Sequence, residues 1–215
     1  MKKNLTELVF ILDRSGSMAG LEGDTIGGFN AMLQKQRGEP GEAVISTVLF
    51  DNETEVIHDR IPLDRVPRLT EKEYYVRGCT ALLDAVGGAI HHIGNVHKYA
   101  REEDRPEKTL FVITTDGMEN ASRRYTYDKG MAMLERQREK YGWEFLFLGA
   151  NIDPAREAAR FGIRADCAAD YHADSIGTEA VYESVCEAVC QVRRAAPLKA
   201  SWKQKIDADF KGRKR

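Results

Sequence analysis

The sequence lacks several features that would have assigned the protein to a common class. No apolar run approaches the roughly 20 residues that a membrane-spanning helix requires. The formal net charge is only −2, so no strong overall field draws the chain to an anionic membrane or to nucleic acid, and we expect neither as a partner. The first apolar stretch is short, contains Glu7 and ends in Asp13 and Arg14 without a small-residue cleavage site, which argues against a signal peptide.

Cysteine is scarce, and its spacing argues against two kinds of site. The four cysteines are Cys79, Cys167, Cys186 and Cys190. No pair shows the C-x-x-C spacing of zinc ribbons and redox motifs. Cys186 and Cys190 lie one helical turn apart, so we expect them to face the core from a helix. In the absence of a secretion signal, we expect reduced thiols and a cytoplasmic protein.

Signatures of several catalytic classes are also missing. The chain has no G-x-x-x-x-G-K-[ST] phosphate loop, no G-x-S-x-G nucleophile elbow and no H-E-x-x-H zinc motif. His91 and His92 are adjacent on a predicted helix and point in different directions, so they do not predict a zinc site. We therefore expect no enzymatic activity.

What the sequence does contain is a regular alternation of strand and helix patterns. Buried strands are predicted from short apolar runs within residues 7–13, 42–52, 108–117 and 143–151, and a final short strand within residues 167–174. Helical spacing fills residues 23–38, 80–100, 128–142, 153–162 and 177–195. This order predicts a doubly wound α/β domain with a mostly parallel sheet and helices on both faces.

One strand and the carboxyl-terminal segment depart from that pattern. Residues 54–63 alternate more and follow the short link "FDNET", which predicts a hairpin and an antiparallel edge strand. Pro197 ends the last helix of a domain that spans residues 1–196. Residues 197–215 are basic and weakly periodic, which predicts a flexible tail, with Trp202 and Phe210 as its candidate contact residues.

Oxygen-bearing side chains follow two of the predicted strands. Asp13, Ser15 and Ser17 come directly after the first strand, and Asp116 follows "VITT". Thr80 lies near the start of a helix, so a third loop can bring a hydroxyl to the same edge of the sheet. Two carboxylates and three hydroxyls are ligands that a small, hard cation prefers. The sequence therefore predicts a Mg²⁺ site, which Mn²⁺ or Ca²⁺ could also occupy.

Several other polar residues near this edge allow two interpretations each. Asp51 follows a strand and could support the site or form a turn, and Asp84 could cap a helix or face solvent. The remaining candidates could shape ligand choice or serve only the loops that carry them: Glu119, Asn120, Arg123 and Arg124.

These pieces together resemble one family. The stretch "DRSGS" fits the D-x-S-x-S motif of von Willebrand factor type A domains, "GCTALLDA" resembles the threonine loop of that family, and "ITTDGMEN" resembles its second aspartate strand end. They occur in the family order, form a complete metal-ion-dependent adhesion site, and belong to a resemblance that covers residues 5–194. The resemblance implies that Ser15 and Ser17 bind the metal directly. It implies Thr80 as a direct or water-mediated ligand, and Asp13 and Asp116 as ligands that act largely through water.

The resemblance also implies a function. A protein of this family, here of a bacterial intracellular type, would bind a partner whose glutamate or aspartate completes the metal shell, within an ATPase- or stress-response-type assembly. An alternative is a metal-dependent hydrolase of the phosphatase kind, in which the cation activates water or Ser15 acts as nucleophile. A third possibility is a metal that only stabilises the fold.

Overall fold

The computed structural model describes residues 1–213 and shows one six-stranded sheet in the order β3-β2-β1-β4-β5-β6. The strands are β1 (Lys2–Asp13), β2 (Glu42–Phe50), β3 (Thr54–Pro62), β4 (Pro106–Thr115), β5 (Glu144–Gly149) and β6 (Ala168–Asp170). All neighbouring strands pair in parallel except β2 and β3, which form the antiparallel hairpin that the sequence predicts. The predicted fold class is therefore confirmed.

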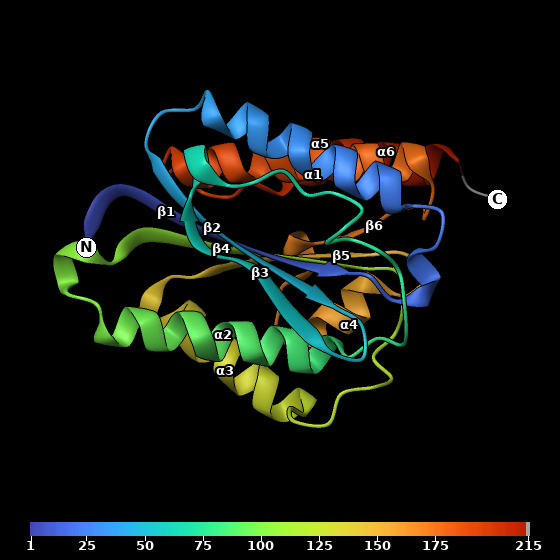
Figure 1. The fold of residues 1–215 in the computed structure, drawn as a ribbon, viewed down its shortest axis with the longest axis horizontal. Helices are drawn as coiled ribbons and strands as arrows, with labels where there is room; N and C mark the ends of the chain where they lie inside the picture. Colours follow the sequence, from blue (N-terminus) through green and yellow to red (C-terminus); the bar gives the residue numbers. More distant parts are fainter. Residues whose placement is uncertain (214–215) are drawn as a thin grey trace.

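Six helices cover the two faces of the sheet (Figure 1). They are α1 (Glu22–Arg37), α2 (Leu82–Tyr99), α3 (Tyr127–Tyr141), α4 (Pro154–Arg160), α5 (Ser175–Arg193) and α6 (Gln204–Gly212). Helices α1, α5 and α6 pack on one face, and α2, α3 and α4 on the other. None of the helices in residues 1–213 is long and apolar enough to cross a membrane.

Burial on both faces explains why β1 is a nearly continuous apolar run. Leu8, Phe10 and Leu12 enter the core beneath α1 and α5, while Val9 and Ile11 enter the core beneath α2 and α3. Because successive side chains of a strand point to opposite faces, a central strand between two helical layers needs apolar residues at every position.

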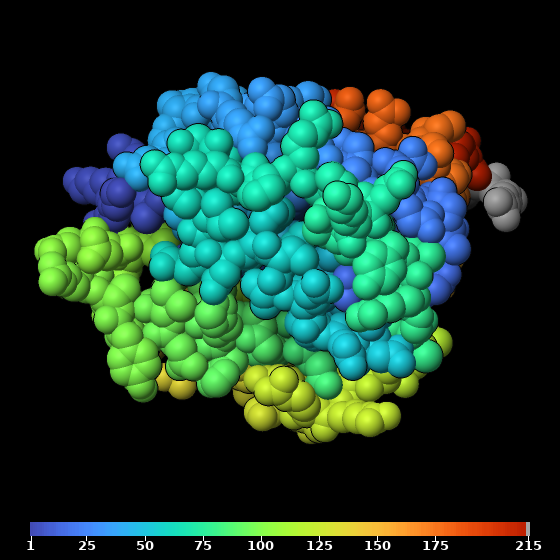
Figure 2. Space-filling view, in the orientation of Figure 1, coloured from blue at the N-terminus to red at the C-terminus, as the bar shows by residue number. Residues whose placement is uncertain are grey.

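The strand order places a topological switch point between β1 and β4. From β1 the chain passes through α1 to β2 on one side, and after the hairpin it passes through α2 to β4 on the other. The connection from β3 to α2 spreads over the face shown in Figure 2, where residues 63–81 appear in teal to green. It is fastened to α1 by hydrogen bonds in both directions between Leu69 and the Asn30 side chain.

The carboxyl-terminal segment differs from the predicted flexible tail. Residues 200–203 form a short 3₁₀ helix that leads into α6, and Trp202 is only 1% exposed. The Trp202 indole N–H donates to the Asp166 carbonyl, and Ile206, one turn later, is also buried. The basic composition concealed this pair of apolar residues, which pack against α5 and β6. Residues 214 and 215, also part of the predicted tail, lie outside the described residues.

The cysteines are all unpaired. Cys186 is buried on α5 and Cys190 is partly buried one turn later, as the sequence predicts. The Gln36 side-chain amide donates to both sulfur atoms, which fastens α1 to α5.

Candidate metal centre

The candidate site lies where the sheet changes direction, at the carboxyl ends of β1 and β4. Asp13 is the last residue of β1, and Asp116 directly follows Thr115, the last residue of β4. Leu12 pairs with Thr114 across the two strands, so the two aspartates leave the sheet side by side. Open α/β sheets bind their ligands in this kind of crevice.

The structure brings all five predicted residues together. Ser17 Oγ donates to Asp116 Oδ1 at 2.5 Å, and the Oγ atoms of Ser15 and Ser17 lie 3.1 Å apart. A methyl group at Gly117 would lie 3.2 Å from Thr80 Oγ1 and 3.5 Å from Ser17 Oγ, so both hydroxyls lie beside the same glycine. The five-oxygen cluster is Asp13, Ser15, Ser17, Thr80 and Asp116.

Asp13 is held rigidly inside the cluster and is only 1% exposed. Its carboxylate accepts hydrogen bonds from the Ser15 backbone N–H at 2.7 Å and from Thr115 Oγ1 at 2.6 Å. Burial raises the pKa of Asp13 to about 6, although these hydrogen bonds oppose the rise. The negative charge of Asp116 raises it further. A cation between the two carboxylates would favour their ionised forms and so oppose this rise.

Two further atoms fit a bound cation. Asp116 Oδ2 is buried without a hydrogen-bond partner, and burial raises the pKa of this carboxyl as well. Thr80 is only 3% exposed as a residue, but its hydroxyl is not among the buried atoms without a partner, so of the two only Asp116 Oδ2 is a buried oxygen that lacks one. Buried oxygens without partners are costly unless an ion or water satisfies them. Residues 1–213 contain no cluster of three or more His, Cys, Asp or Glu, so a cation here would depend on hydroxyl as well as carboxylate oxygens.

The loop after β4 holds the threonine loop in place. Asn120 and Thr80 exchange two hydrogen bonds, from Asn120 N–H to the Thr80 carbonyl and from Thr80 N–H to Asn120 Oδ1. Glu119 accepts from the Leu83 N–H in the first turn of α2 and from the Ser122 N–H in its own loop. Of the two interpretations of Glu119 and Asn120, these contacts favour loop chemistry.

A buried ion pair joins the three loops from the other side. Arg14 is fully buried, and its Nε donates to Asp51 Oδ2 at 2.9 Å. Asp51 also accepts from Arg77 Nε at 2.7 Å, and its backbone carbonyl accepts from the Ala81 N–H beside Thr80. Asp51 also makes the predicted turn by accepting from the Glu53 N–H.

Asp84 has a structural role that the sequence interpretation did not anticipate. Its carboxylate accepts from three consecutive backbone N–H groups, those of Arg123, Arg124 and Tyr125. The loop backbone is therefore anchored to α2, while the side chains of Arg123 and Arg124 are exposed.

Two residues that support the cluster were missed in the sequence. The Tyr74 hydroxyl donates to the Asp13 carbonyl at 2.5 Å, and Thr115 bonds the Asp13 carboxylate. Thr115 could have been found from its position before Asp116 in a strand end. Tyr74 lies 61 residues from Asp13 in a connection without regular structure, so no spacing pattern identifies it.

The five histidines of the chain make their contacts away from the cluster. His58 bonds Thr47, His91 bonds Asn95, His92 bonds Asp59, His97 bonds Glu7 and His172 bonds the Phe210 carbonyl. The serine hydroxyls of the cluster therefore have no imidazole partner among the described residues.

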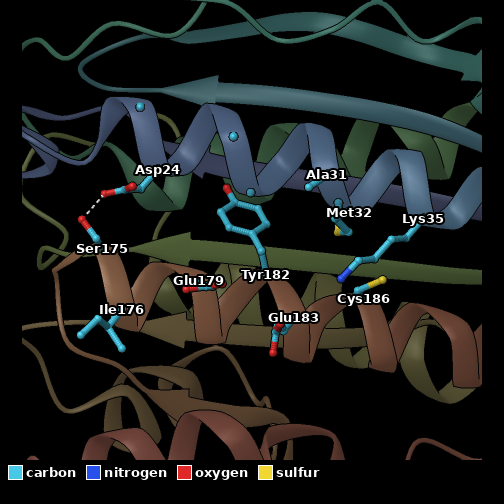
Figure 3. Close-up of a pocket in the computed structure, with 13 residues that line it drawn as sticks. Asp24, Ala31, Met32, Lys35, Ser175, Ile176, Glu179, Tyr182, Glu183 and Cys186 are labelled. Carbon is cyan, nitrogen blue, oxygen red and sulfur yellow. Dashed lines mark hydrogen bonds between the residues drawn. The ribbon is translucent and has the colours of Figure 1, made fainter.

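A separate groove of ≈410 Å³ lies between α1 and α5 (Figure 3). Ser175 Oγ donates to Asp24 Oδ2 across this groove at 2.6 Å, and Tyr182 and Met32 line it between the helices. Its lining includes no member of the five-oxygen cluster.

Comparison with known proteins supports the fold. No family model matches the chain, and no curated protein matches it in sequence. Among solved structures, a von Willebrand factor type A protein from Catenulispora acidiphila aligns with a TM-score of 0.59 at 15% identity, over 86% of this chain and 42% of that chain. The protein therefore has a von Willebrand factor A-type fold.

Two other solved structures with this fold come from a mussel byssus protein and a bacterial pilin. Proximal thread matrix protein 1 from the mussel byssus, in a form with a zinc-occupied MIDAS motif (MIDAS abbreviates metal-ion-dependent adhesion site), aligns with a TM-score of 0.59 at 13% identity. That alignment covers 86% of this chain and 46% of the neighbour. A mutant of the PilB minor pilin from Streptococcus sanguinis aligns with a TM-score of 0.60 at 11% identity. That alignment covers 89% of this chain and 63% of the pilin chain. The chain thus spans less than two thirds of the length of these neighbours, and the likeness concerns the fold.

Proposed function

We propose that the protein is a divalent-cation-dependent protein-binding module. Asp13, Ser15, Ser17, Thr80 and Asp116 would hold Mg²⁺, and a glutamate or aspartate of a partner protein would complete the shell. The observation that carries this proposal is the convergence of the five side chains at the switch point around a buried carboxylate oxygen without a partner. We further propose that the partner belongs to an ATPase- or stress-response-type assembly in the cytoplasm.

The chemistry of the cluster supports an outside ligand. Two carboxylates roughly balance a divalent charge, and the neutral hydroxyls of Ser15, Ser17 and Thr80 add no further negative charge. When bound, the cation would supply an electrophilic centre able to accept an oxygen ligand from outside the chain. The exposed position of Ser17 leaves the cluster open to such a ligand.

Thr80→Val gives the sharpest test because valine keeps the shape and removes only a hydroxyl without a partner in the described chain. Titration calorimetry with Mg²⁺ or Mn²⁺ should show binding for the wild type and a large loss of binding for the variant. Thr178→Val is the matched control, since Thr178 is also a buried threonine with an unpartnered hydroxyl but lies on α5. Undetectable divalent binding by the wild type, or equal binding by Thr80→Val, would overturn the metal site.

The partner is tested separately. Affinity capture from the native cell should retain proteins in Mg²⁺ that are lost in EDTA and that Thr80→Val does not retain. If the wild type binds the cation while both baits capture the same proteins, the metal does not mediate partner binding. A large loss of thermal stability in EDTA with unchanged captured proteins would favour a cation that only stabilises the fold.

A further inference from the structure

A second site lies at the opposite end of the sheet from the five-oxygen cluster. The C-terminal halves of α2 and α3 line a groove of ≈790 Å³, whose wall also includes the beginning of β4 and Trp143, the residue before β5. We call this cavity the basic groove. Its volume falls within the range of roughly 300–1,000 Å³ that is typical of small-molecule sites.

Two largely buried residues that carry polar groups line the basic groove. Trp143 and Thr109 both line it and are each only 3% exposed. Neither the Trp143 indole N–H nor the Thr109 hydroxyl forms a hydrogen bond within residues 1–213, whereas the other tryptophan, Trp202, donates to a carbonyl at 2.9 Å. Neither atom is among the buried side-chain atoms without a partner, so both reach accessible surface and can donate to a bound molecule.

The Trp143 ring is rigidly placed. It stacks on Phe111 with centroids 5.2 Å apart and packs edge-on against His97, also at 5.2 Å. His97 is in turn fixed by its Nε2 contact with the buried Glu7 carboxylate at 2.8 Å. A donor held this firmly loses little entropy when it binds a ligand.

Positive charge dominates the wall of the basic groove. Four cations line it, against the carboxylates of Glu102 and Glu107, and within the described chain none of the four lies within 4.0 Å of a carboxylate. They are Lys98, Arg105, Arg136 and Lys140. Glu107 is partly satisfied, because it accepts from the Asn4 N–H at 2.8 Å.

Two of these four cations lie at helix ends and have no carboxylate partner there. Lys98 and Lys140 lie in the last turns of α2 and α3, where the helix dipole favours cations. Arg105 Nε donates to the Ala100 carbonyl at 3.1 Å just beyond the end of α2. These helix ends carry partial negative charge that offsets part of the positive charge, but the four full charges exceed it, so the groove still attracts anions. Lys140 and Arg136 also lower the pKa of Tyr141 at the rim.

We propose that the basic groove binds a small phosphorylated molecule. Phosphate oxygens accept hydrogen bonds only, which matches the Trp143 N–H, the Thr109 hydroxyl and the surrounding cations. The source could be a nucleotide or an inorganic phosphate, since both offer the same oxygens. This site is independent of the five-oxygen cluster and of the function proposed for it.

The test is an NMR titration of ¹⁵N-labelled protein. EDTA in the buffer prevents a metal ion at the five-oxygen cluster from binding the added phosphate. The chain has two tryptophans, so two indole N–H signals report the outcome, and Trp143→Phe assigns them. Pyrophosphate should shift the Trp143 signal and leave that of Trp202 in place. AMP binding more tightly than pyrophosphate identifies a nucleotide site and the reverse identifies an inorganic one, while adenosine should not bind.

Variants separate a specific site from general attraction. Lys140→Ala should weaken binding about tenfold, because a charge-assisted hydrogen bond is worth at least one factor of ten. Thr109→Val should also weaken it without lowering the melting temperature, since the lost hydroxyl has no partner in the described chain. Lys129→Ala, in the first turn of α3 and outside the groove, is the matched control. No shift of Trp143 at millimolar pyrophosphate, or equal weakening by Lys129→Ala, would overturn the proposal.

Discussion

The ion pair between Arg14 and Asp51 gives the strongest stability prediction for this fold. Both side chains are buried, with exposures of 0% and 2%, and Arg14 Nη2 is already buried without a partner. Asp51→Asn keeps the shape of the side chain, but it removes the negative charge and turns an amide NH₂ toward guanidinium donors. Breaking a buried pair on one side typically costs about 3–5 kcal/mol, because the remaining charge stays buried.

The structure places the expected cost at the lower end of that range. Glu55 still lies 2.8 Å from Arg14 Nη1, but it is half exposed and therefore compensates only weakly. Tyr75 adds a ring 5.3 Å from the guanidinium. We expect a loss of about 3 kcal/mol, which corresponds to a melting temperature lower by about 6–12 °C for a chain of this size.

Urea unfolding monitored by circular dichroism measures this cost, with an unchanged m-value as the sign of a pure stability effect. Asp59→Asn is the matched control, because Asp59 pairs with His92 at 2.9 Å while both side chains are about half exposed. An exposed pair contributes about 0–1 kcal/mol. If Asp51→Asn costs no more than Asp59→Asn, the buried pair does not hold the loops and the reasoning fails.

The pH dependence of the same pair follows from the Asp51 pKa. Burial raises it, but hydrogen bonds from Arg77, the Glu53 N–H and Arg14 outweigh burial, so the folded pKa lies below the ordinary value near 3.8. The contribution of Asp51 to stability is therefore complete above that ordinary value and is lost as the pH falls through the folded pKa. The difference in unfolding free energy between wild type and Asp51→Asn should shrink at strongly acidic pH and stay constant between neutral and mildly acidic pH.

Three further outcomes test other parts of the structure. Trp202→Ala should cost about 3–5 kcal/mol in urea unfolding, because it empties a buried site, whereas a flexible tail would make it neutral. Gly28→Ala should lower the melting temperature, since its methyl group would lie 2.2 Å from the buried Tyr182 ring; an unchanged value would show that the ring moves freely. Burial and the charge of Asp153 raise the pKa of Asp170 to about 6, so its ionised form destabilises the fold above that pH. Asp170→Asn should raise the melting temperature at pH values above about 6 and have no effect below about 4, and equal effects at both would contradict this sign.

The local sequence was sufficient to predict the positions of the two aspartates. Asp13 and Asp116 each follow a short apolar run, and in a doubly wound fold the end of such a run lies at the carboxyl edge of the sheet. The spacing of apolar residues likewise predicted α2 and, with it, the position of Thr80. The hairpin could be predicted from the short link before Thr54, because a link of so few residues can join only antiparallel neighbouring strands.

Contacts between distant segments could not be read in the same way. Apolar periodicity records that a residue is buried but not what it contacts, so nothing in the sequence joined Tyr74 to Asp13. The same limit hid the Arg14 and Asp51 pair, because a charge after a strand usually lies in solvent. It also made the segment around Trp202 look like a basic tail.

The sequence alone determined the strands and helices up to α5, though not α6, and it placed the oxygen-bearing side chains at strand and helix ends, because these properties depend on neighbours within a few positions. The tertiary structure decided that β4 lies beside β1, so that Asp116 meets Ser17, and that Trp143 and Thr109 share a groove with four cations. These contacts depend on the order of the strands and the packing of the helices, which are set by the free energy of the whole folded chain.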